Sequence, residues 1–185
     1  MTTIDTRAPV SAPTTPLRTL YLARFGFAVV WALLLVLTAR SLSPLSIALL
    51  LLYPLVDLAA AVVDHRTSRA TRPARALLAN MALSLLATIG LAFAVTSGLP
   101  AVLVVWGLWA ITAGIVQLVV AVSRRALGGQ WPLIVSGGIS VLAGAAFLVQ
   151  AGTAGASLTS LAGYATLGGI FFLVSALRLR RTTRG

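Results

Sequence analysis

One carboxylate in this sequence stands inside a long apolar stretch. Asp57 lies between YPLV and LAAAVV, whereas Asp5 is near the N-terminus and Asp64 is at the end of the same stretch. A lone ionised carboxylate in hydrocarbon costs several kcal/mol, so it must be neutral, paired or turned toward a polar cavity. The surroundings of Asp57 are therefore the first place to look for chemistry.

Arg24 offers Asp57 a partner, because it also lies within an apolar stretch. Arg24 comes 17 residues before Ser41 and Asp57 comes 16 residues after it. If a helical hairpin turns near Ser41, the two side chains reach nearly the same depth on adjacent helices, since each residue advances a helix by about 1.5 Å. We predict an Arg24–Asp57 ion pair.

Two amides repeat this geometry in neutral form. Asn80 and Gln117 flank a second turn at Gly98, and an amide pair there would hydrogen-bond between helices. Two interpretations of Arg24, Asp57, Asn80 and Gln117 stay open: they fasten neighbouring helices, or they line a polar cavity.

Pro54 lies three residues before Asp57 and cannot donate to the Leu50 carbonyl. This predicts a freed acceptor and a kink near the buried acid. Broken helices beside a buried charge occur at transport sites, and membrane prolines also serve as simple packing kinks.

Most catalytic chemistry has no apparatus in this sequence. There is no cysteine, which excludes disulfides, thiolate catalysis and thiolate metal sites. His65 is the only histidine, in a predicted polar loop without the converging donors that a metal site needs. We therefore expect no catalytic residue, no metal and no cofactor, and a protein that is not an enzyme.

The elements that must position the polar residues are six apolar segments. The chain has 185 residues, of which 59% are hydrophobic and 9% charged, while soluble domains have roughly a quarter of their residues charged. About 20 residues span about 30 Å of hydrocarbon as a helix. We predict an all-α domain over residues 20–181, after a disordered cytoplasmic tail at residues 1–19. Its six spans lie at residues 20–38, 42–63, 76–96, 99–122, 131–150 and 157–177.

Arginine placement predicts the orientation. Thirteen of the fourteen arginines fall toward one end of the predicted bundle, and Arg40 alone falls at the other. Because positive residues near spans stay in the cytoplasm, both termini are expected inside, at the inner (plasma) membrane. The net charge of +11 then suits anionic lipid headgroups, at about 1 kcal/mol per arginine, and we expect no nucleic-acid partner.

An internal repeat relates the odd-numbered spans. An offset of 56 residues aligns Arg24, Asn80 and Ser136, and also the residues four and eight positions further on. The even-numbered spans align less regularly, with Asp57, Gln117 and Phe172 at one level. The chain therefore reads as three tandem helical hairpins, which stack to complete a common core.

A stripe of small residues accompanies the repeat in the fifth span. Ser136, Ser140 and Gly144 stand four residues apart, so they share one side of a helix. Small residues at this spacing let membrane helices approach closely. The stripe predicts either packing within the chain or the contact face of a homo-oligomer.

The later spans resemble the HdeD family of small bacterial membrane proteins. The resemblance covers about residues 20–180 and is strongest in WGLWAITAGIVQLVVAVSRR (106–125), GGQWPLIVSGGISVLAGAAF (128–147) and GYATLGGIFFLVSALRLR (163–180). It implies a short helical repeat and, because the namesake is associated with acid resistance, a role in acid or envelope stress. It supplies no catalytic residues. Two alternatives remain: a small transporter or channel with a polar site at the level of Arg24, Asp57 and Gln117, and an oligomeric membrane scaffold.

Overall fold

The computed structural model describes residues 14–39, 41–67, 74–123, 125–127 and 130–182, and within these ranges helices are the only regular secondary structure. Six long helices follow one another, with a single turn of 3₁₀ helix, η1, at Arg125–Leu127 between the fourth and fifth. Their bounds are α1 Thr14–Thr38, α2 Pro44–Thr67, α3 Ala74–Ser97, α4 Leu99–Ser123, α5 Trp131–Ala151 and α6 Thr159–Thr182.

Each of the six helices contains an apolar segment of 20–25 residues, which is long enough to cross a bilayer. The outward surface is apolar too: Leu37, Phe93 and Leu142 are among many large hydrophobic side chains that are mostly exposed. Such a surface is stable against lipid and not against water. The prediction of an all-α protein with six membrane-spanning helices is confirmed, and the chain is a multi-pass membrane protein.

The helix boundaries follow from proline and glycine. Pro44, Pro100 and Pro132 stand in the first turns of α2, α4 and α5, where a missing N–H costs nothing. Gly98 links α3 directly to α4 with φ of 100°, a left-handed conformation that favours glycine.

Two predicted boundaries are corrected. Residues 14–19, assigned to the disordered tail, belong to α1; Pro16 is accommodated there because it lies in the first helical turn. The rest of the predicted tail lies outside the described residues. His65, assigned to a loop, lies in the last turn of α2.

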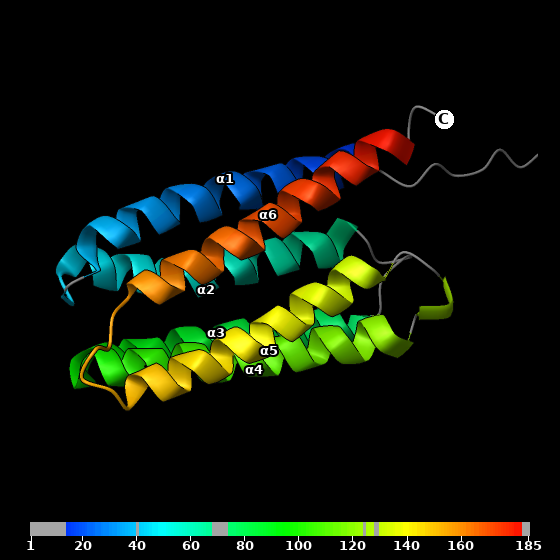
Figure 1. The fold of residues 1–185 in the computed structure, drawn as a ribbon. Coiled ribbons are helices and arrows are strands. Elements are labelled where there is room, and N and C mark those ends of the chain that lie inside the picture. Colours follow the sequence, from blue (N-terminus) through cyan, green and yellow to red (C-terminus); the bar gives the residue numbers. More distant parts are fainter. Residues whose placement is uncertain (1–13, 40, 68–73, 124, 128–129, 183–185) are drawn as a thin grey trace, which may run out of the picture.

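The helices form a flattened ring. Each packs against the next in chain order, and α6 returns to pack against α1. Figure 1 shows two layers of the ring, with α1, α2 and α6 on one side and α3, α4 and α5 on the other. The most extensive contacts join α4 to α5 and α1 to α6, whereas α1–α2 and α5–α6 touch least. The three predicted hairpins thus describe the connectivity, while the tightest packing lies between hairpins.

Glycines explain the closeness of α4 and α5. A Cβ atom added to Gly144 would lie 2.6 Å from the carbonyl oxygen of Gly107, and one added to Gly114 would lie 2.8 Å from that of Gly137. The two backbones therefore touch at two levels, as small residues allow in membranes. Gly144, from the predicted stripe, is used in packing within the chain.

The core lies in one half of the bundle, away from the arginine-rich helix ends. It is built from the C-terminal halves of odd helices and the N-terminal halves of even ones, and includes Trp31, Leu35, Leu50, Leu91, Leu103, Trp106, Leu158 and Leu161. The rings of Trp31 and Trp106 have centroids 5.6 Å apart, and Tyr53 packs against both. Trp31 Nε1 donates to the Leu49 carbonyl at 2.6 Å, one residue before the acceptor predicted to be freed by Pro54. We call this region the packed half.

Candidate functional site: a polar cavity inside the bundle

The other half of the bundle is hollow. A cavity of about 390 Å³ is lined by side chains from all six helices. Its lining runs from Ala76 and Gln130, at the arginine-rich ends of α3 and α5, inward to Trp109 and Tyr164, where the packed half begins. We call this region the hollow half.

Arg24 and Asp57 form the predicted ion pair at the edge of this cavity. Arg24 Nη2 on α1 donates to Asp57 Oδ1 on α2, and the two side chains are 20% and 13% exposed. The second oxygen, Oδ2, accepts from Asn80 Nδ2 at 3.0 Å and from Ser84 Oγ at 2.8 Å, both on α3. Three donors from two helices thus satisfy the buried carboxylate, which compensates for its removal from water.

Ser84 is a partner of Asp57 that the sequence analysis did not assign. It lies one helical turn beyond Asn80, in the same repeat stripe, so both side chains approach the carboxylate from one face of α3. The spacing of four residues between an amide and a hydroxyl was the available signal.

The predicted Asn80–Gln117 amide pair is not formed, although both residues line the cavity. Gln117 Nε2 donates instead to the Leu133 carbonyl on α5, at 3.0 Å. Residue counting placed the two amides at one depth but not on facing sides of the ring. Asn80 turns toward α2, where the ionised carboxylate is a stronger acceptor than a neutral amide.

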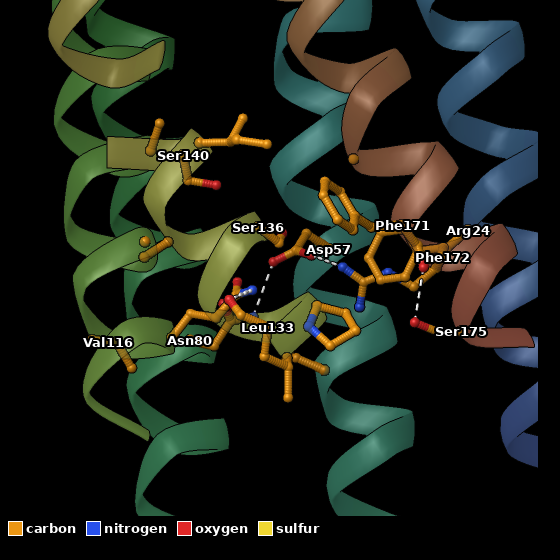
Figure 2. Close-up of a pocket in the computed structure, with 18 of the residues that line it drawn as sticks. Arg24, Asp57, Asn80, Val116, Leu133, Ser136, Ser140, Phe171, Phe172 and Ser175 are labelled. Atoms are coloured by element: carbon orange, nitrogen blue, oxygen red, sulfur yellow. Dashed lines mark hydrogen bonds and ion pairs between the residues drawn. The ribbon is translucent and has the colours of Figure 1, made fainter. Parts of the chain in front are cut away.

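Arg24 retains hydrogen-bonding capacity. A guanidinium carries five N–H donors, and among the described residues one of its nitrogens is engaged, by Asp57. Its Cζ lies 4.1 Å from the centroid of the Phe172 ring, a cation–π contact that orients the group. Figure 2 shows Arg24 between Asp57 and Phe172 at the side of the cavity.

The repeat positions converge on this cavity. The aligned residues of odd helices, Arg24, Asn80 and Ser136, and of even helices, Asp57, Gln117 and Phe172, all line it. One turn deeper the aligned residues are Ala28, Ser84 and Ser140, and all three are buried. The aligned positions at one depth thus supply much of the polar lining of the cavity, and the aligned positions one turn deeper are buried in the helix packing.

The small-residue stripe of α5 divides between the two halves. Ser136 lines the cavity, Ser140 accepts a hydrogen bond from Tyr164 Oη at 3.0 Å, and Gly144 packs against α4. All three are therefore turned into the ring.

Aromatic side chains form much of the cavity wall, which the sequence analysis did not predict. They are Tyr21, Tyr53, Trp109, Tyr164, Phe171 and Phe172. Tyr53 stands four residues before Asp57, so the periodicity of α2 was a usable signal. Apolar walls with a few convergent polar groups, in a space of roughly 300–1,000 Å³, are typical of small-molecule sites.

Fold and site together define a multi-pass helical membrane protein with an internal polar cavity. In the described part of the chain no cluster of three or more metal-ligating side chains is found. No family model, curated protein or solved structure matches the chain.

Proposed function

We propose that this protein is a non-enzymatic solute carrier that binds a small molecule in the hollow half and releases it across the membrane. The observation that supports it most is a cavity containing a paired charge and closed at one end by the packed half. Substrate sites near mid-membrane, open to one side at a time, are the general design of secondary transporters.

The alternative that the four polar residues only fasten helices explains less. The packed half holds the same helices together with apolar and aromatic contacts. A fastening pair needs no cavity beside it and no aromatic wall. The hydroxyl of Ser136 and the spare donors of Arg24 have a use if a ligand enters.

The packing also supplies units that can move. The α4–α5 pair and the α1–α6 pair are the most closely packed and lie in opposite layers of the ring. Rocking of one packed unit against another around a fixed site is a common route to alternating access. In this proposal the layers separate at the packed half as they close over the hollow half.

A labelling experiment tests the proposal in the native chain, which has no cysteine. Ser136→Cys in sealed vesicles should react with a membrane-impermeant maleimide from the arginine-rich side, and more slowly from the other side as the carrier alternates. Ala165→Cys, buried in the packed half, is the control and should react far less from the first side. Labelling of Ser136→Cys from one side only, under all conditions, would contradict transport.

The orientation of the carrier is part of the proposal. The arginines predict that the hollow half opens to the cytoplasm. Reporter fusions after Arg75, Arg125 and Arg184 should all report a cytoplasmic location. An external signal from any of them would contradict the predicted orientation of the hollow half.

The resemblance to the HdeD family supports acid or envelope stress as the physiological setting. A deletion strain should then survive less well at low pH, and a carrier variant blocked in the cavity should not restore survival. Equal survival of the deletion and parent strains would contradict a role in acid stress without contradicting the carrier proposal.

The scaffold alternative is less supported, because the small residues that could form a contact face between copies are used within the chain. Gly107, Gly114, Gly137 and Gly144 lie in the contact between α4 and α5.

A further inference from the structure

The ring has one weak seam, between α5 and α6. These helices share the smallest contact of any neighbouring pair in the ring as described. They are fastened from mid-membrane toward the packed half: Tyr164 Oη donates to Ser140, Ser160 Oγ donates to Gln150 Oε1 at 2.7 Å, and the Phe147 and Tyr164 rings meet edge to face. The fastened part of the seam therefore coincides with the packed half.

In the hollow half the facing residues of the same two helices line the cavity. Ser136 of α5 and Phe171 and Ser175 of α6 lie on its walls (Figure 2). Leu133 and Leu167, one on each helix, also line it and are 45% and 46% exposed. Two half-exposed leucines thus border the cavity on the two helices that form the weak seam.

Charge selects the kind of molecule that fits. The described helix ends on this side carry Arg18, Arg66, Arg75, Arg125 and Arg178. A positive field at the mouth of a cavity raises the local concentration of anions. Inside, Arg24 has donors beyond the one given to Asp57, and guanidinium matches carboxylate and phosphate geometry.

We propose that the ligand is an anionic amphiphile of the membrane, which enters sideways through the α5–α6 seam. Its carboxylate or phosphate headgroup accepts hydrogen bonds from Arg24, and its chain lies along the aromatic wall and out between Leu133 and Leu167. This inference rests on the proposed carrier function and names the substrate class of the same cavity.

The head and the chain of such a ligand would contact different parts of the cavity. The apolar and aromatic wall alone would accept any alkyl chain, and a neutral lipid would then bind equally well. The Arg24 guanidinium adds hydrogen bonds that are stronger to an anionic head than to a neutral one. Selectivity for the anion over the neutral lipid is therefore the signature of the proposal.

The test uses the full-length protein in phosphatidylcholine nanodiscs and a long-chain fatty acid that carries a photoreactive diazirine. Crosslinks located by mass spectrometry should concentrate at residues 133–140 and 167–175. A monoacylglycerol with the same chain should crosslink there about tenfold less, because it lacks one charge-assisted hydrogen bond to Arg24. Equal crosslinking by the two probes would overturn the recognition of an anion.

A matched pair of variants tests the binding site. Gly168 lines the cavity, and a Cβ atom there would lie 4.0 Å from the Tyr53 hydroxyl, whereas a Cβ atom on Gly163 of the same helix meets nothing within 4 Å. Gly168→Phe should fill the cavity and remove the fatty-acid crosslinks. Gly163→Phe, which adds the same ring outside the cavity, should retain them. Retained crosslinks in both variants, or lost crosslinks in both despite unchanged thermal stability, would contradict binding of the fatty acid in the cavity.

Two further experiments show whether the anion comes from water or from the membrane, and whether a negative result rejects the substrate class or the carrier function. Acetate and inorganic phosphate at millimolar concentration should not displace the probe, and full displacement would indicate a water-borne anion and overturn the lateral route. The double variant Arg24→Gln/Asp57→Asn removes both charges together and should bind fatty acid and monoacylglycerol alike. If Ser136→Cys is labelled from both sides but the native chain crosslinks fatty acid and monoacylglycerol equally, the proposed substrate class is wrong and the carrier function is retained. If Ser136→Cys is labelled from one side only, the carrier function itself is wrong.

Discussion

The two halves of this bundle are made from the same six helices and differ in what the helices turn inward. In the packed half, indole rings and leucines fill the ring, and Trp31, Leu35 and Trp106 are almost completely buried. In the hollow half, the same helices present a carboxylate, a guanidinium, two amides and several hydroxyls around a cavity of about 390 Å³. The repeat that positions both halves is shared, so the difference lies in side-chain type and not in backbone design.

This contrast indicates how the stability of the protein is distributed. Aromatic pairs such as Trp31–Trp106 contribute about 0.5–1.5 kcal/mol each beyond their buried area, and the glycine contacts of α4 and α5 add close backbone packing. The hollow half gives up such contacts and keeps a part-buried ion pair, whose partial removal from water costs free energy. A closed half that holds the ring together allows the other half to remain open for a ligand.

The largest effect should come from breaking the ion pair on one side. Asp57→Ala leaves the Arg24 guanidinium buried without its acceptor, and Asn80 and Ser84 lose theirs. We expect a loss of about 3–5 kcal/mol in the free energy of unfolding, measured by denaturation in detergent micelles.

The control for this prediction is the double variant Arg24→Gln/Asp57→Asn, which removes both charges while keeping polar side chains of similar shape. It should recover most of the lost stability. If Asp57→Ala is as stable as the native chain, water compensates the unpaired guanidinium and the ion pair does not contribute to stability.

An intermediate effect is expected in the packed half and at its glycine contacts. Gly144→Ala would place a methyl group 2.6 Å from the Gly107 carbonyl oxygen, so α4 and α5 must move apart. We expect a destabilisation of about 1–3 kcal/mol in the same assay, as for other overpacked sites. Gly138→Ala is the matched control on α5, because its Cβ meets nothing within 4 Å, and it should be neutral or slightly stabilising.

The smallest effect should come from removing one of the three donors to Asp57. Ser84→Ala deletes the 2.8 Å bond to Oδ2 while leaving Arg24 and Asn80 in place, and should cost about 0.5–1.5 kcal/mol. Ser175→Ala, at another wall of the cavity, removes a hydroxyl that donates to the Phe171 carbonyl of its own helix and should cost less. Equal losses in the two variants would mean that the three-donor arrangement adds nothing specific.

Much of this architecture is predictable from one-dimensional information. Apolar length determines the six spans, and counting residues on either side of a turn determines depth, which is why the Arg24–Asp57 pair could be predicted. Depth says nothing about the angle around the helix axis. The Asn80–Gln117 pair failed for that reason, since Asn80 turns toward Asp57 on α2 and Gln117 turns toward Leu133 on α5.

The packing between hairpins could not be predicted from the sequence either. Glycines at 107, 114, 137 and 144 are common residues in membrane helices, and their pairing depends on which two helices meet. The cavity depends on the same unknown, because it exists where polar residues of all six helices face one centre. A start of α1 at Thr14 was missed because a proline in the first turn resembles a helix breaker.

The central claim, that one half is hollow and water-accessible while the other is dry, is tested most directly along a single helix. Single cysteines at 161, 165, 168 and 175 of α6 pass from the packed half into the cavity, and the native chain contributes no background thiol. The rate of reaction with a small water-soluble thiol reagent should be low for Leu161→Cys and Ala165→Cys and higher by at least about tenfold for Gly168→Cys and Ser175→Cys, because thiolates form only where water reaches. Equal rates along the helix, or a higher rate at 161 and 165, would contradict the division of the bundle into a packed and a hollow half.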